Sequence, residues 1–387
     1  MNSVIVIFLA VAGLVSAALL WRNKTGFSDD MDETQAEDIR VSPLLRGINF
    51  LLSDQPDQAL QEMVQVAKIR SEAADVYMAL GEMFRAQGEY GRAVRIHQNL
   101  LARPDVPLDL HFQAYVSLGR DFQAGGLLDR ALRHYAKALA MQPDHLESLR
   151  ACLRIREQSH EWTEAEWLVS RLEQIEAVSY HEHRAYLYAE MAKGALLDID
   201  LDTCEAHLTA ALDLSTKCGH AHLLRMESLM QQQKWDDVLA QAASFLAEVA
   251  EQHQGLLPHV LMLDASFYSS KAEGFLWDAW QSKPDVELGL CWIESLAEHQ
   301  GAQAALTLQA KLNLQDLSLR HELRLLALSD EKDNLIEQAK QWRLSKNNYA
   351  CKQCGVQVHD MRWQCPKCNT WGSMMPLQTS LIFGGDE

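Results

Sequence analysis

The feature that most constrains the fold is a repeat of small residues near the start of the chain. Each of three glycines is followed twelve residues later by an alanine. The first two glycines are 34 residues apart, and the next step is 38, with the extra residues in the proline-bounded segment 104–107. A period of this length predicts stacked helix pairs, because one pair alone cannot bury its apolar stripe. The repeating positions are Gly47, Gly81 and Gly119, with Ala59, Ala93 and Ala131.

The residue types fit a close crossing of two antiparallel helices. Glycine and alanine let the helices approach, and Phe84 and Phe122 fill the gap one turn further on. Gly88 and the pair Gly125-Gly126 predict the turn between the two helices, where a left-handed residue ends the first one. The order of residue types, which is Leu-Gly, then an aromatic residue, then alanine and proline, resembles the tetratricopeptide pattern.

Helical periodicity continues toward Ser345 with a weaker signature. Asp202 and Trp235 begin segments that we interpret as later second helices of a pair. Tryptophans further on are predicted to fill the core. We therefore predict an all-α tetratricopeptide-repeat solenoid over residues 42–345, with about eight to nine helix pairs and degenerate later units.

Four cysteines near the C-terminus form two CxxC pairs separated by ten residues. This spacing brings four thiolates around one tetrahedral ion, so we predict one closed, structural zinc or iron site. Two disulfides or a redox-active CxxC are the alternatives. Gly355 suits the sharp turn after the first pair. We assign residues 346–387 to a small metal-binding domain whose predicted ligands are Cys351, Cys354, Cys365 and Cys368.

An uncharged apolar run occupies residues 4–21. Its eighteen residues would span about 27 Å as a helix, against a hydrocarbon core of about 30 Å. Arg22 and Lys24 follow at once, which predicts that the rest of the chain lies on the cytoplasmic side. A cleaved signal peptide is the alternative. We predict a transmembrane helix at 1–22 and an acidic linker at 23–41.

Composition and motifs argue against nucleic-acid binding and catalysis. With 53 acidic and 35 basic residues, the net charge is −18, and no basic surplus can replace phosphate counterions. The sequence contains no phosphate loop, nucleophile elbow or HExxH motif, so we expect no enzymatic activity. We expect a polypeptide partner on the first helix of each pair, although these residues could equally form a solvated face. The candidate partner-binding residues are Met78, Glu82, Arg85, Arg120 and Gln123.

Several strings of residues resemble the lipopolysaccharide assembly protein B family of the bacterial inner membrane. They follow one another along the full length, with a looser match over 180–345. The strings are GINFLLS at 47–53, FRAQGE at 84–89, RAVRIHQ at 92–98, LGRD at 118–121, YACKQCG at 349–355 and WQCPKCNTW at 363–371.

The resemblance implies a single-pass inner-membrane protein with its bulk on the cytoplasmic side. It implies a rubredoxin-like metal domain and an adaptor that regulates lipopolysaccharide biosynthesis. The implied partners are the membrane-anchored ATP-dependent metalloprotease, the deacetylase that commits precursor to lipid A, and a membrane-embedded lipopolysaccharide sensor. A scaffold for lipopolysaccharide synthesis and export proteins, or a rubredoxin-type electron carrier, is the alternative. The sequence leaves open whether the chain forms a homodimer.

Two further expectations follow from the metal domain. Asn369 stands where rubredoxins usually have glycine, and asparagine tolerates the left-handed backbone needed there. The connector 346–348 reaches at most about 11 Å, so the domain should dock on the repeats. We expect contact with residues 80–125; the alternative is packing only on helices after about residue 280.

Overall fold

The computed structural model describes residues 46–47, 50, 55, 58, 61–62, 74–104, 106–314, 319–328 and 347–377. The predicted membrane helix and acidic linker lie outside these residues. Within the described ranges, no helix is both long and apolar enough to cross a bilayer. The chain divides into two units, unit 1 ending at Gly126 and unit 2 beginning at Leu127.

Unit 1 contains helices α4 (Ala74–Ala86), α5 (Tyr90–Leu101) and α6 (Leu108–Ala124). The predicted small-residue crossing is present, because a Cβ on Gly81 would lie 2.3 Å from Nε2 of His97 on α5. Ala93 and Phe84 are fully buried beside it. The turn between α4 and α5 has the expected left-handed glycine, Gly88, with φ of +80°.

A buried polar group ties α6 to α4 and α5. Asp121 is completely buried, and its Oδ2 lies 2.5 Å from Nδ1 of His97. Its Oδ1 accepts a hydrogen bond from Arg85 at 2.9 Å. A buried carboxylate is tolerated only when its oxygens are paired in this way, so the three side chains stabilise unit 1 together.

Unit 2 begins with regular helix pairs. Asp202 and Trp235 lie at the starts of second helices, as predicted. The turns inside these pairs hold left-handed residues that are not glycine, namely His160, Ile199 and Gln233, so no glycine marks them in the sequence. The helices are α7 (Leu128–Met141), α8 (Leu146–Gln158), α9 (Trp162–Glu176), α10 (His181–Leu197), α11 (Leu201–Leu214), α12 (Gly219–Gln231) and α13 (Trp235–Glu248).

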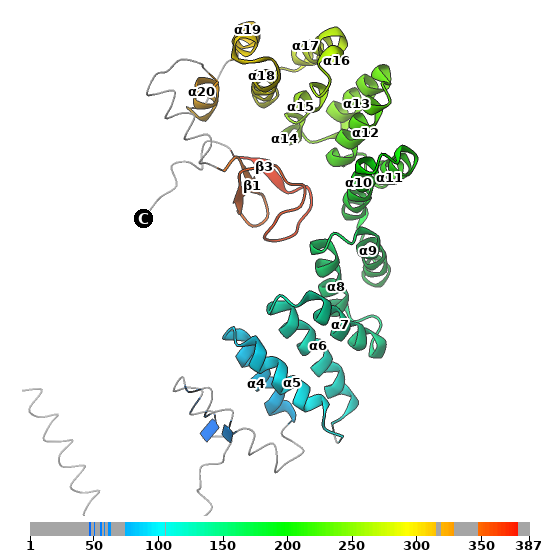
Figure 1. Ribbon diagram of the computed structural model, residues 1–387, viewed down its shortest axis with the longest axis vertical. Helices are drawn as coiled ribbons and strands as arrows, with labels where there is room; N and C mark the ends of the chain where they lie inside the picture. Colours follow the sequence, from blue (N-terminus) through cyan, green and yellow to red (C-terminus); the bar gives the residue numbers. More distant parts are fainter. Residues whose placement is uncertain are drawn as a thin grey trace, which may run out of the picture. The chain divides into compact units, whose positions relative to one another are not determined.

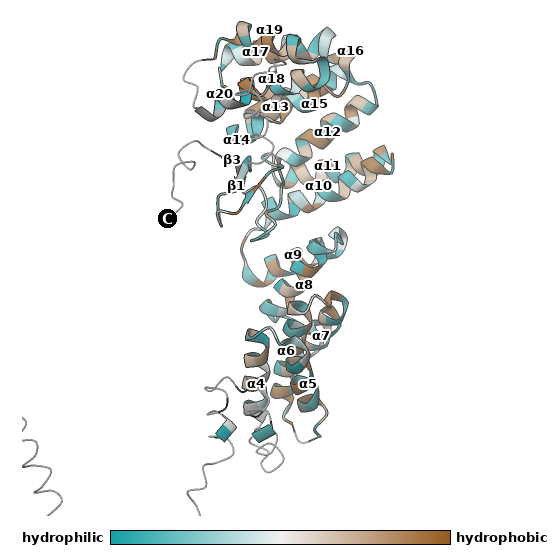
Figure 2. Ribbon diagram, turned by 60° about the vertical axis from the view of Figure 1, so that its left-hand side comes forward, coloured by the Kyte–Doolittle hydropathy of each residue, from teal (hydrophilic) through white to brown (hydrophobic). Residues whose placement is uncertain are grey.

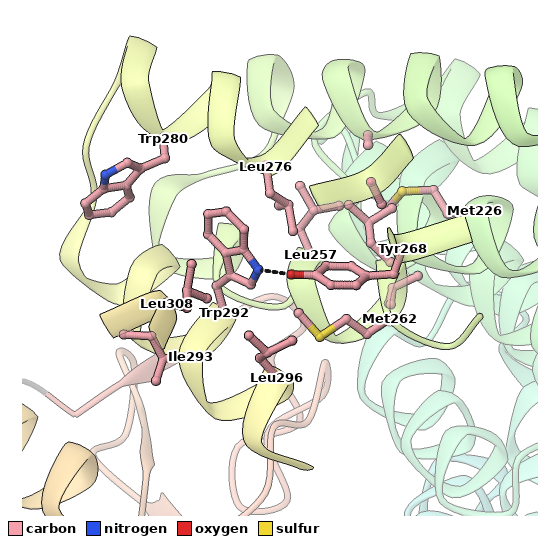
Figure 3. Close-up of a cluster of buried hydrophobic side chains, with 14 of the residues drawn as sticks. Met226, Leu257, Met262, Tyr268, Leu276, Trp280, Trp292, Ile293, Leu296 and Leu308 are labelled. Atoms are coloured by element: carbon pink, nitrogen blue, oxygen red, sulfur yellow. Dashed lines mark hydrogen bonds between the residues drawn. The ribbon is translucent and has the colours of Figure 1, made fainter. Parts of the chain in front are cut away.

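Beyond α13 the pairs become irregular. The buried core there contains Trp292, whose indole N–H donates to the hydroxyl of Tyr268 at 2.7 Å (Figure 3). Trp280 lies in the same core, as expected for a filler residue. The elements are α14 (Glu251–Gln254), α15 (Leu257–Leu261), α16 (Ala265–Phe267), the π-helical η2 (Tyr268–Ala272), α17 (Glu273–Ser282), α18 (Val286–Gln300), α19 (Ala302–Leu312) and α20 (Leu319–Leu326).

Residues 347–377 form a small metal-binding fold, which we call the ribbon. Its strands β1 (Tyr349–Cys351), β2 (Gln357–Val358) and β3 (Met374–Pro376) make an antiparallel sheet in the order β2-β1-β3. Ala350 pairs with Gln357 on one side and with Met375 on the other. The ribbon lies on the inner side of the curved row of helices in unit 2, with β3 beside α14 (Figures 1 and 2).

A four-cysteine site docked on the helical array

The structure brings together the four cysteines that the spacing singled out. Their sulfur atoms all lie within 4.8 Å of one another, and none forms a disulfide. Sγ of Cys351 is 3.6 Å from Sγ of Cys368, and Sγ of Cys354 is 3.6 Å from Sγ of Cys365. Sulfurs bound tetrahedrally to zinc at about 2.3 Å would be about 3.8 Å apart, so this set fits one ion.

Backbone geometry at both knuckles supplies hydrogen-bond donors to sulfur. Gly355 has φ of +71° and Asn369 has φ of +58°, so both predicted left-handed turns are confirmed. The amide of Cys368 donates to Sγ of Cys365 at 3.5 Å. Burial opposes ionisation of the Cys351 thiol, but hydrogen bonds from Ser373 and from backbone amides outweigh it and lower its pKa to about 6. The first knuckle therefore favours the thiolate that a metal requires.

A bound zinc or iron ion would cross-link the two knuckles and hold the ribbon folded. Cys351, Cys354, Cys365 and Cys368 would be its ligands. The protein contributes the turns that aim these four sulfurs at one point, and the amides that stabilise their negative charge.

One tryptophan beside the second knuckle anchors the ribbon to the array. The indole N–H of Trp371 donates to Oε1 of Glu157 on α8 at 3.1 Å, and the Gln364 amide donates to Oε2 at 3.1 Å. His183 on α10 donates to the same carboxylate at 2.6 Å. Glu157 is 4% exposed, so its charge is almost fully enclosed by these three donors. The indole also stacks on Tyr186, with ring centroids 5.4 Å apart.

The second tryptophan of the ribbon packs on α12 and α14. The Trp363 ring stacks on His220 at a centroid distance of 5.5 Å and meets the edge of His253 at 5.1 Å. Burial, and to a lesser extent the nearby Lys193, lowers the pKa of His220 to about 3, so its imidazole stacks as a neutral ring. A Cβ on Gly219 would lie 2.8 Å from the Trp363 ring, which leaves room for glycine alone.

Two backbone features complete the contact. His253 donates through Nε2 to the carbonyl oxygen of Met374 at 2.9 Å. Gly372 has φ of +61°, and a Cβ there would lie 2.5 Å from the Tyr186 hydroxyl, so both conformation and space require glycine. We call the array residues Glu157, His183, Tyr186, Gly219, His220 and His253 the docking surface.

The position of the docking surface differs from one of our expectations. The alternative that the ribbon packs only on helices after about residue 280 is wrong, because α8, α10, α12 and α14 hold it. The expected contact with residues 80–125 concerns unit 1 and stays a prediction. One signal for docking was visible in the sequence, since a 31-residue ribbon cannot bury both Trp363 and Trp371 by itself.

The candidate partner-binding residues lie in unit 1. Oε1 of Glu82 lies 3.8 Å from the Arg85 guanidinium and 3.7 Å from that of Arg120, so α4 and α6 share a charged cluster. Met78 and Gln123 are both half-buried, and Met78 packs beside Leu100, Val106 and Ala114. The structure thus brings Glu82, Arg85 and Arg120 together, while their binding of a partner stays a prediction.

An array of tetratricopeptide-type helix pairs that carries a docked rubredoxin-like ribbon defines the class of this protein. Residues 349–376 match the family described as rubredoxin metal binding domain, and residues 76–108 match the tetratricopeptide repeat. The chain is 25% identical to lipopolysaccharide assembly protein B of Escherichia coli K12, over 94% of this chain and 96% of that protein. The protein of the same name from Haemophilus influenzae is 28% identical over the same shares. The chain is therefore a homologue of lipopolysaccharide assembly protein B, as its sequence indicated.

Solved structures share the helical repeat loosely. A tetratricopeptide repeat protein from Parabacteroides merdae has a TM-score of 0.32 and 12% identity, covering 73% of this chain and 96% of its own. The Naa15/Naa10 complex bound to HypK has a TM-score of 0.40 and 14% identity, covering 78% of this chain and 46% of its own. Similarity at this level carries no information on function.

Proposed function

We propose that the chain regulates lipopolysaccharide assembly as an adaptor of the bacterial inner membrane. In this proposal residues 1–22 anchor it, the array lies on the cytoplasmic side, and it presents the lipid A-committing deacetylase to the membrane-anchored ATP-dependent metalloprotease. A membrane-embedded lipopolysaccharide sensor restrains it. The adaptor binds and positions its partners and performs no chemistry itself.

The observation that carries the proposal is the order of parts along the chain. Relatives named for lipopolysaccharide assembly align with 94% of it, through the repeats and the ribbon alike. Helical repeats of this kind commonly present extended surfaces to other proteins. In unit 2 the docking surface is occupied by the ribbon, so the charged cluster of Glu82, Arg85 and Arg120 in unit 1 is our candidate surface for a partner.

The proposal can be tested in the organism that encodes the chain. Depletion of the protein should lengthen the half-life of the deacetylase, and the full-length protein purified from membranes should carry the deacetylase and the metalloprotease. An unchanged half-life with both proteins still bound would favour the alternative, in which the chain is a scaffold for lipopolysaccharide synthesis and export proteins. An unchanged half-life without either would refute both interpretations.

A charge reversal can locate the partner surface. In cells depleted of the wild-type protein, Arg120→Glu should fail to shorten the lengthened half-life of the deacetylase fully. The reason is that it places a second carboxylate beside Glu82 and alters the charged cluster. Arg150→Glu is the matched control, since Arg150 pairs with Glu176 on the surface of unit 2 and its side chain is 54% exposed. Equal function of the two variants would exclude the charged cluster as the partner surface.

A further inference from the structure

Two hydroxyl groups lie against the cysteine sulfurs from the segment that follows the second knuckle. Oγ1 of Thr370 is hydrogen-bonded to Sγ of Cys368 at 3.3 Å. Oγ of Ser373 is hydrogen-bonded to Sγ of Cys351, also at 3.3 Å. Within residues 347–377 these are the serine and threonine side chains, and both are hydrogen-bonded to ligand sulfurs. Cys351 and Cys368 are themselves 3.6 Å apart, so one short segment reaches one edge of the sulfur tetrahedron.

The direction of these hydrogen bonds follows from the charge of the loaded site. A metal-bound thiolate carries no proton, so it can only accept, and each hydroxyl must donate to sulfur. Ser373 has a second acceptor, the Thr370 carbonyl at 3.0 Å, but its single proton favours the charged sulfur because charge-assisted hydrogen bonds are stronger. Four thiolates and one divalent ion leave a net charge of −2, which such donors stabilise.

The amide donors of the knuckles are distributed unequally over the two sulfurs. Backbone amides of Gln353 and Cys354 donate to Cys351, whereas Cys368 receives the amide of Thr370. Cys368 is also the one cysteine of the four that is exposed to solvent. The Thr370 hydroxyl therefore supplements the sulfur that water and competing ligands reach most easily.

We propose that Thr370 and Ser373 are positioning residues of the metal site, whose hydroxyls hold the Cys368 and Cys351 thiolates in place and reduce their electron density. This role is independent of any partner protein. It predicts slower metal release and weaker sulfur-to-metal electron donation than amide donors alone would give.

The test compares variants of the full-length protein loaded with Zn²⁺ or Co²⁺. Thr370→Val and Ser373→Ala should each release zinc to a chelating dye about tenfold faster, since loss of a donor to a ligand typically costs 10–100-fold. The sulfur-to-cobalt charge-transfer band of each variant should shift to lower energy. Thr370→Ser keeps the hydroxyl and should behave like the wild type.

A matched control separates the ligand role from a general hydroxyl–sulfur contact. Thr163 on α9 lies 3.8 Å from the sulfur of Met191, so Thr163→Val removes a comparable contact away from the metal site. The band is recorded only from loaded protein, so it reports the site even where a variant folds in lower yield. Release rates and band positions equal to those of Thr163→Val would overturn the proposal. Equal defects in Thr370→Ser and Thr370→Val would also overturn it, because they would assign the effect to packing.

Discussion

Replacing Glu157 by alanine should release the ribbon from the helical array. The carboxylate is 4% exposed and accepts hydrogen bonds from two ribbon groups, the Trp371 indole and the Gln364 amide, each at 3.1 Å. Hydrogen bonds to a charged acceptor contribute about 1.5–3 kcal/mol each, and the variant also leaves His183 without its acceptor. We expect the free energy of local opening to fall by about 3 kcal/mol.

Hydrogen exchange of the ribbon segment 363–377 measures this opening. A loss of about 3 kcal/mol corresponds to exchange that is roughly 100-fold faster. Trp371→Phe keeps an aromatic ring but removes the pyrrole half of the indole with its N–H, so a double-mutant cycle with Glu157→Ala is needed to isolate the hydrogen bond, and it should give a coupling of about 1.5–3 kcal/mol.

Glu161→Ala is the control for loss of a carboxylate from the same region. Glu161 pairs with Arg156, and both side chains are about one-third exposed, so this change should cost less than about 1 kcal/mol. Similar exchange in Glu157→Ala and Glu161→Ala would refute the claim that the buried carboxylate holds the ribbon.

Three further changes test the packing. Gly219→Ala places a methyl group 2.8 Å from the Trp363 ring and should weaken docking by about 1–3 kcal/mol; wild-type exchange over 363–377 would contradict this. Ile199→Gly replaces a β-branched residue that has a left-handed backbone with φ of +61°, so it should raise the free energy of unfolding of unit 2 by about 0.5–1 kcal/mol, seen as a higher urea midpoint. A lower midpoint would disprove strain there. Asp121→Asn breaks the buried pair with His97 and should destabilise unit 1 by about 3 kcal/mol, measured as faster exchange in α4–α6; unchanged exchange would show that the pair contributes little.

The sequence predicted the parts of this fold that depend on local spacing. The four sulfurs meet because two CxxC knuckles are each a local turn, and Gly81 accompanies a close helix crossing. The docking surface could not be found in this way. Glu157 looks like any helical glutamate, and its contact with Trp371 depends on how far the row of helices curves over 214 residues. No periodic pattern encodes that curvature.

Irregular helices limited the prediction in a different way. Periodicity beyond residue 253 correctly indicated helix in the described residues up to 328, but the chain there breaks into short helices and the π-helical segment η2. These breaks bring Tyr268 to the Trp292 indole in the buried core (Figure 3). Tertiary packing, rather than residue spacing, decides where such helices begin and end.

The contact between α8 and the end of the ribbon changes the topology of the solenoid. An open row of repeats makes contacts only between neighbours, so it can fray from either end one unit at a time. Here the segment just before β3 returns to α8, and the chain from Glu157 to Trp371 forms a closed circuit. Repeats inside the circuit cannot separate from its C-terminal side until the ribbon leaves. During synthesis the circuit closes last, because the ribbon is made after every helix that it joins, and the inner side of α8–α14 stays open to other proteins until then.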